Sequence, residues 1–174
     1  FNSLNSISSL TMISPEKAQE MIIKLSEFLR YSLSNKDEKL TTLRDEINNL
    51  SRYLDIEKIR FGNRLNIIYK LDEKCFDKKL PSLILQPLIE NAVKYGVYEK
   101  TEQTDIEISS YCSDNELFVS IKNQYDAEFP YKKGAGIGIQ NIFSRLKIIY
   151  GRDDLLTIKK TNNVFEAKIE FPQT

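Results

Sequence analysis

The chain has 174 residues, and 41% of them are hydrophobic, which allows one domain with a packed core and argues against bulk disorder. Basic and acidic residues number 25 each, so the net charge is zero and no nucleic-acid partner is expected, because nucleic-acid binders usually carry a basic excess. The sequence contains no histidine, which excludes histidine-based catalysis and histidine-ligated zinc within these residues.

The ends of the chain and its cysteines indicate a fragment of a cytosolic region. The sequence starts with Phe1 in the middle of a pattern and without an initiator methionine, so we interpret it as a fragment. No apolar run reaches the length of a membrane span, and no secretory signal opens the chain. Cys75 and Cys112 lack a metal-binding spacing, and we expect both to be reduced thiols.

The first 34 residues predict a helical hairpin. Residues 2–13 resemble the end of a helix, and Ser14-Pro15 provides an N-cap and a first helical position for a second helix. Apolar residues then recur at spacings of three and four: Ala18, Met21, Ile22, Leu25, Phe28, Leu29 and Leu33. This stripe either packs on the rest of the chain or forms a dimer interface.

A linker and a third helix follow. Residues 34–39 are polar and charged, as in a linker. Thr42 and Asp45 form a capping box for a helix that continues to about Arg60. Gly62-Asn63 ends this helix.

The remaining residues alternate between strand and helix patterns. Strands are expected at 65–71, from 106, at 117–121, at 156–158 and at 165–171, and helices at about 82–95 and 137–150. The last two strands meet at Asn162-Asn163, and another turn lies at 113–115. Strands interleaved with helices and linked by hairpins predict an α+β fold: an α/β sandwich with a mixed sheet and helices on one face.

The helix at 82–95 carries the first candidate site. Glu90, Asn91 and Lys94 form one polar edge, because residues 90 and 94 lie one turn apart. The apolar residues of the same helix would face the sheet: Leu88, Ile89, Ala92 and Val93. An amide oxygen beside a carboxylate suits Mg²⁺, which prefers oxygen ligands and keeps several waters. The alternative is an ordinary Glu–Lys surface pair with an incidental asparagine.

A glycine-rich turn carries the second candidate site. Gly134, Gly136 and Gly138 allow the backbone to approach a ligand closely, and the helix that follows offers unpaired N–H groups to phosphate. The alternative is a flexible loop before a helix. The polar stretch 124–133 has the length of a lid, and its alternative is a plain surface loop.

These motifs resemble the GHKL ATPase superfamily, and within it the LytS/YehU-like sensor histidine kinases. Residues 80–92, with Leu80-Pro81 and the run from Leu85 to Ala92, resemble the N box of that family. Residues 134–151 resemble its G2 box, and residues 25–33 resemble its second dimerisation helix. The residues Phe1-Asn2 resemble the tail of its His-Phe-x-Phe-Asn phosphoacceptor box, which would place the histidine three residues before Phe1.

The resemblance implies two parts and a set of site residues. Residues 1–36 would be a truncated dimerisation hairpin without its phosphoacceptor, and residues 37–174 a GHKL-type two-layer ATP-binding domain. Asn91 would ligate Mg²⁺, and Glu90 would be catalytic by polarising the acceptor imidazole or ordering a metal-bound water. The ATP-binding set would be Asn91, Lys94, Asn123, Gly134, Gly136, Ile137, Gly138 and Ile139, with ATP and Mg²⁺ as cofactors.

The resemblance also implies the biology of the intact protein. That protein would be a homodimer, joined through the N-terminal helices, that phosphorylates its own histidine and passes the phosphoryl group to an aspartate of a response regulator. It would be anchored in the bacterial inner membrane by segments outside this chain. The fragment itself would be cytoplasmic and is not expected to autophosphorylate.

The sequence departs from the family pattern in two places. Asn123 stands where the family has an aspartate that binds the adenine amino group, and the glycines that follow are missing. Tyr95 replaces a common histidine before Gly96. Two other functions therefore stay open: a degenerate, non-catalytic dimeric scaffold, and another ATPase of the GHKL superfamily.

Overall fold

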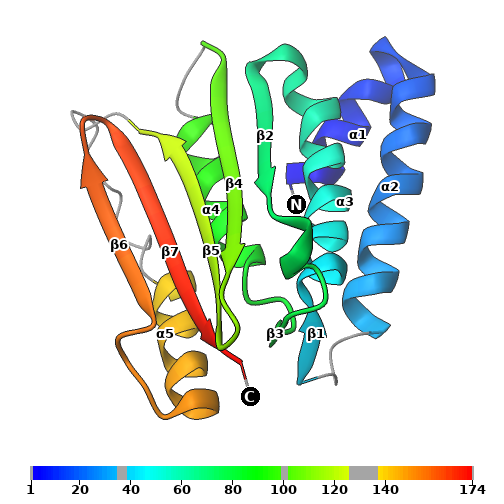
Figure 1. Cartoon of the computed structure of the whole chain (residues 1–174). Coiled ribbons are helices and arrows are strands. Elements are labelled where there is room, and N and C mark those ends of the chain that lie inside the picture. The colour runs from blue at the N-terminus through cyan, green and yellow to red at the C-terminus, as the bar shows by residue number, and fades with distance from the viewer. Residues whose placement is uncertain (1, 35–38, 99–101, 126–136, 174) are drawn as a thin grey trace.

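The computed structural model describes residues 2–34, 39–98, 102–125 and 137–173 (Figure 1). The helices are α1 (Asn2–Ile13), α2 (Pro15–Ser34), α3 (Leu43–Phe61), α4 (Gln86–Gly96) and α5 (Ile137–Tyr150), with single 3-10 turns η1 (Gly62–Arg64) and η2 (Glu73–Cys75). The strands are β1 (Leu40–Thr42), β2 (Leu65–Leu71), β3 (Lys79–Pro81), β4 (Thr104–Cys112), β5 (Glu116–Gln124), β6 (Leu156–Thr161) and β7 (Val164–Pro172).

The main sheet is mixed, as predicted. Its strand order is β2-β4-β5-β7-β6, in which β2 and β4 run parallel and the other neighbours run antiparallel. Asn162 and Asn163 join β6 to β7, and both have positive φ angles. Two such residues form the tight hairpin turn whose twist matches that of the flanking strands.

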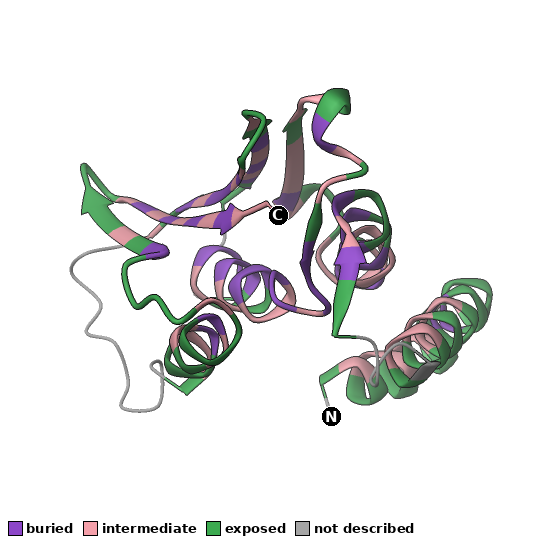
Figure 2. Ribbon diagram, turned by 60° about the horizontal axis from the view of Figure 1, so that its bottom comes forward, coloured by how far each residue is buried: buried purple, intermediate pink, exposed green. Residues whose placement is uncertain are grey.

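Helices α4 and α5 cover one face of this sheet, so the predicted sandwich is confirmed (Figure 2). Along β7, every second side chain from Phe165 to Phe171 is buried, while the residues between them face the opposite side of the sheet. The predicted inner face of α4 is buried against the strands: Leu88, Ile89, Ala92 and Val93. The hydrophobic core therefore lies between the sheet and these helices, and α3 adds Leu43, Leu50 and Leu54 to it.

Helix α3 begins and ends as the sequence predicts. The Thr42 hydroxyl accepts the backbone N–H of Asp45 at 3.1 Å, and Gly62 ends the helix with a φ of 56°. The sequence did not predict the small antiparallel ribbon of β1 and β3, in which Leu40 pairs with Pro81. Strands of three residues are too short to produce a recognisable alternation.

The helical hairpin packs on α3 through part of its apolar stripe. Ala18 and Met21 are buried, and the rings of Phe28 and Tyr53 lie 5.9 Å apart. Other members of the stripe are substantially exposed: Ile22, Leu29 and Leu33. The hairpin therefore contacts the rest of the chain and still presents an apolar side to solvent.

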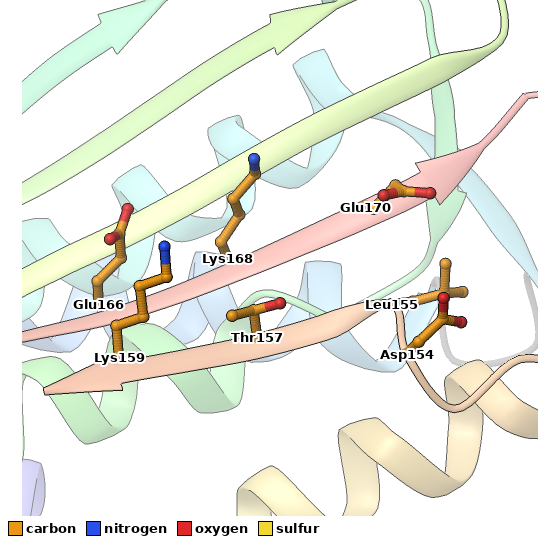
Figure 3. Close-up of a pocket in the computed structure, with 7 residues that line it drawn as sticks. All are labelled: Asp154, Leu155, Thr157, Lys159, Glu166, Lys168 and Glu170. Atoms are coloured by element: carbon orange, nitrogen blue, oxygen red, sulfur yellow. The ribbon is translucent and has the colours of Figure 1, made fainter.

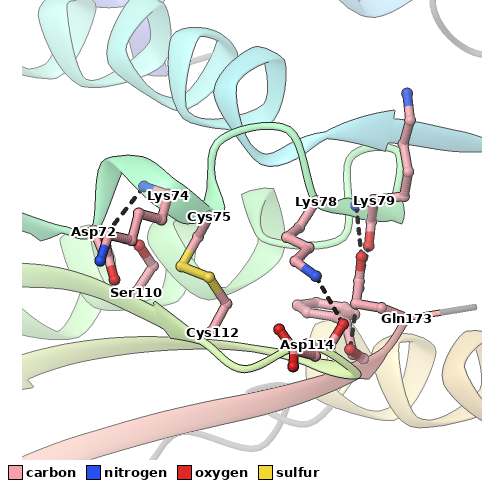
Figure 4. Close-up of a disulfide and its surroundings, with 10 residues drawn as sticks. Asp72, Lys74, Cys75, Lys78, Lys79, Ser110, Cys112, Asp114 and Gln173 are labelled. Carbon is pink, nitrogen blue, oxygen red and sulfur yellow. Dashed lines mark hydrogen bonds between the residues drawn. A yellow bond between two sulfur atoms is a disulfide. The ribbon is translucent and has the colours of Figure 1, made fainter.

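The two cysteines form a disulfide, so the expectation of reduced thiols was wrong (Figure 4). The parallel register of β2 and β4 pairs Leu71 with Ser110, which brings the two strand ends side by side. Cys75 follows β2 and Cys112 ends β4, with their Cα atoms 5.7 Å apart. The sequence separation of 37 residues gave no sign of this contact, because it depends on the pairing of strands.

Candidate functional site

The start of α4 is fixed by side chains from α3 and α5. The Glu46 carboxylate accepts the backbone N–H groups of Leu83 and Leu85, each at 2.9 Å. Arg145 of α5 donates to the carbonyl of Ser82 at 2.8 Å. Helix α4 consequently begins at Gln86 rather than near residue 82, because the preceding backbone groups bind these side chains instead of forming a helical turn.

Glu46 is a buried residue whose role the sequence pattern does not indicate. Burial raises the pKa of its carboxyl group, and the N–H groups of Leu85 and Leu83 and the charge of Arg145 oppose that rise. An acidic residue in the first turn of a helix is usually explained by the helix dipole, so its burial could not be predicted. Its effect is to hold the N-terminus of the helix that carries the candidate site.

The predicted polar edge of α4 faces solvent. Glu90 and Lys94 are exposed, and Glu90 accepts a hydrogen bond from the Gln86 amide at 2.8 Å. The Lys94 ammonium lies 5.1 Å from the centroid of the Tyr95 ring. Of the ion pairs found between described residues, none joins Glu90 to Lys94, so a Glu–Lys surface pair does not account for this edge.

Asn91 lies where α4 meets the first turn of α5. Its amide nitrogen is buried and has no hydrogen-bond partner among the described residues. A Cβ atom added to Gly138 would lie 3.6 Å from this nitrogen and 3.4 Å from Cβ of Pro87. Gly138 thus brings the first turn of α5, whose N–H groups have no partner within the helix, close to the Asn91 amide.

Asn123 lies at the other end of α4. Its side chain is buried, and its amide nitrogen donates to the carbonyl of Gln124 at 3.0 Å. A Cβ atom on Gly96 would approach this nitrogen to 3.6 Å and Cγ2 of Thr104 to 3.0 Å. Gly96 therefore allows the end of α4 to approach β4 and β5 closely, and the Thr104 hydroxyl donates to its carbonyl at 2.7 Å.

The structure gathers most of the described candidates around α4. Asn91 lies on that helix, and Asn123 and Gly138 approach it. Ile137 is exposed at the start of α5, and Ile139 is half-buried against the core. Gly134 and Gly136 lie outside the described residues, as does most of the predicted lid. The roles of all these residues stay predictions.

The side chains at α4 have the chemistry that a magnesium ion requires. Rotating the Asn91 amide by 180° exchanges its nitrogen and oxygen, so the same position can present an oxygen ligand. The Glu90 carboxylate comes from the residue directly before Asn91. Another group of metal-ligand type in the described residues is Asp72 with Cys75 and Cys112, but the disulfide occupies both of its sulfur atoms.

A cavity of about 270 Å³ lies on the outer face of the sheet, away from α4 and α5 (Figure 3). It is lined by Asp154, Leu155, Thr157, Lys159, Glu166, Lys168 and Glu170. Its carboxylates have partners: Glu170 pairs with Arg152 at 3.2 Å, and Glu166 pairs with Lys122 at 3.4 Å. We interpret it as a solvated charged face.

The sequence of the chain matches known sensor kinases. A family model described as histidine kinase matches residues 1–65. Sensor histidine kinase YpdA of Escherichia coli (strain K12) is 32% identical over 160 residues, which cover 87% of this chain and 28% of that protein. Sensor histidine kinase/phosphatase LytS of Staphylococcus aureus (strain Mu50) is 29% identical over 176 residues, which cover 94% of this chain and 30% of that protein.

The chain is related to the LytS-type sensor histidine kinases. It spans less than a third of the length of these relatives. The solved catalytic domain of histidine kinase ThkA superposes with a TM-score of 0.55 at 20% identity, covering 78% of this chain and 96% of that one. Acinetobacter baumannii histidine kinase AdeS superposes with a TM-score of 0.56 at 14% identity, covering 90% of this chain and 81% of that one. The GHKL-type fold of the chain is confirmed.

In the ranges that the structure describes, no helix is both long enough and apolar enough to cross a membrane.

Proposed function

We propose that this chain is the ATP-binding core of a sensor histidine kinase, joined to the end of the hairpin that presents the phosphoacceptor. The observation that carries the proposal is the buried amide nitrogen of Asn91 on α4, which faces the first turn of α5 at Gly138 and has no partner among the described residues. The match to sensor histidine kinases along most of the chain supports this function over another GHKL ATPase. We assign residues 1–36 to the hairpin and 37–174 to the ATP-binding domain.

In this proposal, α4 carries the groups that act on phosphate and on the acceptor. Asn91 contributes a ligand to Mg²⁺, which neutralises charge on the phosphates of ATP when it is bound. Glu90 accepts a hydrogen bond from the acceptor imidazole and polarises it. Lys94, exposed four residues after Glu90, contacts a phosphate.

The other predicted residues bind the rest of the nucleotide. Gly134, Gly136 and Gly138 let the backbone close over the phosphates. Ile137 and Ile139 lie on either side of Gly138 and belong to the same ATP-binding set. Asn123 accepts a hydrogen bond from the adenine amino group through its side-chain carbonyl. Its buried position between β4, β7 and the end of α4 supports this role.

The intact protein would work in a two-component system. It would dimerise through α1 and α2, whose exposed apolar residues support such an interface, and would phosphorylate a histidine upstream of Phe1. The phosphoryl group would pass to an aspartate of a response regulator, a class of partner bound in the solved complex of ThkA with response regulator TrrA. A membrane anchor would lie outside this chain, which alone would not autophosphorylate.

Phosphate transfer in the longer protein tests the proposal. The protein that includes the segment upstream of Phe1 should take up label from γ-labelled ATP on a histidine. Glu90→Gln should reduce the rate by about 100-fold, because a positioned general base contributes on that order. Glu102→Gln, a change at another exposed glutamate, should leave the rate unchanged. A longer protein that binds Mg-ATP and takes up no label would contradict the proposal.

A second candidate function is a dimeric scaffold without kinase activity. It is favoured by one observation: Asn123 is neutral, and its amide nitrogen already binds the carbonyl of Gln124. Asn123→Asp separates the two candidates when ATP binding is measured. In an active kinase this change should preserve or strengthen binding, whereas in a scaffold neither form should bind ATP.

A further inference from the structure

A buried charge pair lies where α1, α3 and the end of α4 meet. Nη1 of Arg60 lies 2.8 and 2.6 Å from the two carboxylate oxygens of Glu57, one turn earlier on α3. The two side chains are only 9% and 3% exposed. Removing both charges from water costs free energy that their attraction does not always recover, so a buried pair is weak support for stability and invites another explanation.

The pair is covered by α1 and by two aromatic rings. Nε of Arg60 donates to the Ser6 hydroxyl of α1 at 3.0 Å. The guanidinium carbon lies 5.0 Å from the ring centroids of both Phe61 and Tyr98, and these two rings meet edge to face. A single guanidinium thus bonds a carboxylate with one nitrogen and α1 with another, which a lysine could not do.

A second polar contact fixes the same face of α1. The Asn2 amide donates to the Tyr98 hydroxyl at 3.3 Å. Asn2 and Ser6 are four residues apart and therefore lie on one side of the helix. Tyr98 comes two residues after the end of the helix that bears Glu90, so both contacts join α1 to the surroundings of that helix.

Glu90 lies within electrostatic reach of this cluster. Burial raises the pKa of Glu57, the positive charge of Arg60 opposes the rise, and the charge of Glu90 adds to it. The pKa of Tyr53 is raised chiefly by burial and further by the charges of Glu57 and Glu90. Two groups of the cluster therefore respond to the charge of Glu90, the carboxylate that the proposed function makes catalytic.

We propose that Arg60, held by Glu57, is a positioning residue that seats α1 beside Glu90 and so sets the approach of the acceptor histidine to ATP. This inference rests on the proposed function for its catalytic consequence. The contacts of Arg60 with Ser6 and of Tyr98 with Asn2 hold α1 whether or not the chain binds ATP.

The kinetic test uses the longer protein that includes the upstream segment. Arg60→Lys should lower kcat for autophosphorylation by about tenfold or more and leave KM for ATP within about twofold, because misplacement of a reactant slows transfer without altering nucleotide contacts. Ser6→Ala, which keeps the buried pair, should lower kcat to a smaller extent. The matched control is Arg152→Lys, at an exposed arginine that bonds Asp154 with two nitrogens.

A second measurement reports the seating of α1 without catalysis. In the chain of residues 1–174, hydrogen exchange of the α1 amides should be faster in Arg60→Lys and Ser6→Ala, and unchanged in Arg152→Lys. Unchanged exchange in both variants would overturn the proposal, as would a rise in KM at constant kcat. Faster exchange together with a longer wild-type protein that takes up no phosphate would overturn the catalytic role, and that result would identify the proposed function as the part that fails.

Discussion

At the scale of single residues, Glu46 holds the site-bearing helix by an unusual means. Its two carboxylate oxygens bind the backbone of residues 83 and 85, and Leu83 has a positive φ of 58°. A leucine in this conformation is strained, so the acceptor that holds its N–H contributes to keeping the loop in place. The Glu46 carboxyl group therefore holds the loop before α4, and its pKa is raised.

Replacing Glu46 should reveal this raised pKa as a change in the pH dependence of stability. A raised pKa means that the folded chain holds the proton more tightly, so the stabilisation is complete below the ordinary pKa and is lost as pH rises through the folded pKa. Glu46→Gln should lower the free energy of unfolding by about 1–3 kcal/mol at acidic pH, because one acceptor oxygen is lost, and by less at neutral pH. Urea unfolding at several pH values measures this, and parallel curves for the two proteins would contradict it.

At the scale of elements, α2 packs on α3 through few side chains. Met21 is 0% exposed in that contact, whereas Met12 at the end of α1 is 87% exposed. Met21→Ala should lower the free energy of unfolding by about 2–5 kcal/mol, because it opens a cavity at a buried site. Met12→Ala is the matched control and should change it by less than about 0.5 kcal/mol. Equal effects of the two changes would show that α2 does not pack on α3 in this way.

The disulfide joins the segment after β2 to the end of β4. It closes a loop across 37 residues, which should stabilise the fold by roughly 3–4 kcal/mol. Urea unfolding without reductant should therefore show Cys112→Ser to be less stable than the wild type by about this amount. With reductant the two proteins should become nearly equal. If the wild type, unfolded without reductant, contains two free thiols, the disulfide is absent.

Elements with a clear period or cap were predictable from the sequence, and those set by tertiary contacts were not. The Thr42 cap, the Asn162-Asn163 turn and the buried face of α4 follow from local rules, and each was predicted. The β1–β3 ribbon, the first residue of α4 and the disulfide depend on partners distant in sequence. The candidate site was predicted from motifs, whereas its support by Glu46 and Arg145 was not.

At the scale of the whole molecule, one apolar surface has no counterpart within the described chain. Ile22 of α2 is 51% exposed, and Leu29 and Leu33 continue the same stripe. If this stripe forms the proposed dimer, Ile22→Glu should weaken self-association by about tenfold or more in analytical ultracentrifugation, because a buried charge lacks a partner. Ile148→Glu, at an 83% exposed position on α5, should leave association unchanged. Identical sedimentation of both variants would exclude this interface.

Residues 1–174 should bind ATP through Mg²⁺ and Asn91, and titration of the chain with a fluorescent ATP analogue measures this binding. Binding should weaken by about tenfold or more when Mg²⁺ is removed by a chelator, and Asn91→Ala should lose that dependence on Mg²⁺. Asn115→Ala, in the exposed turn between β4 and β5, should bind as the wild type does. No Mg²⁺-dependent binding, or an Asn91→Ala variant that binds like the wild type, would contradict the account.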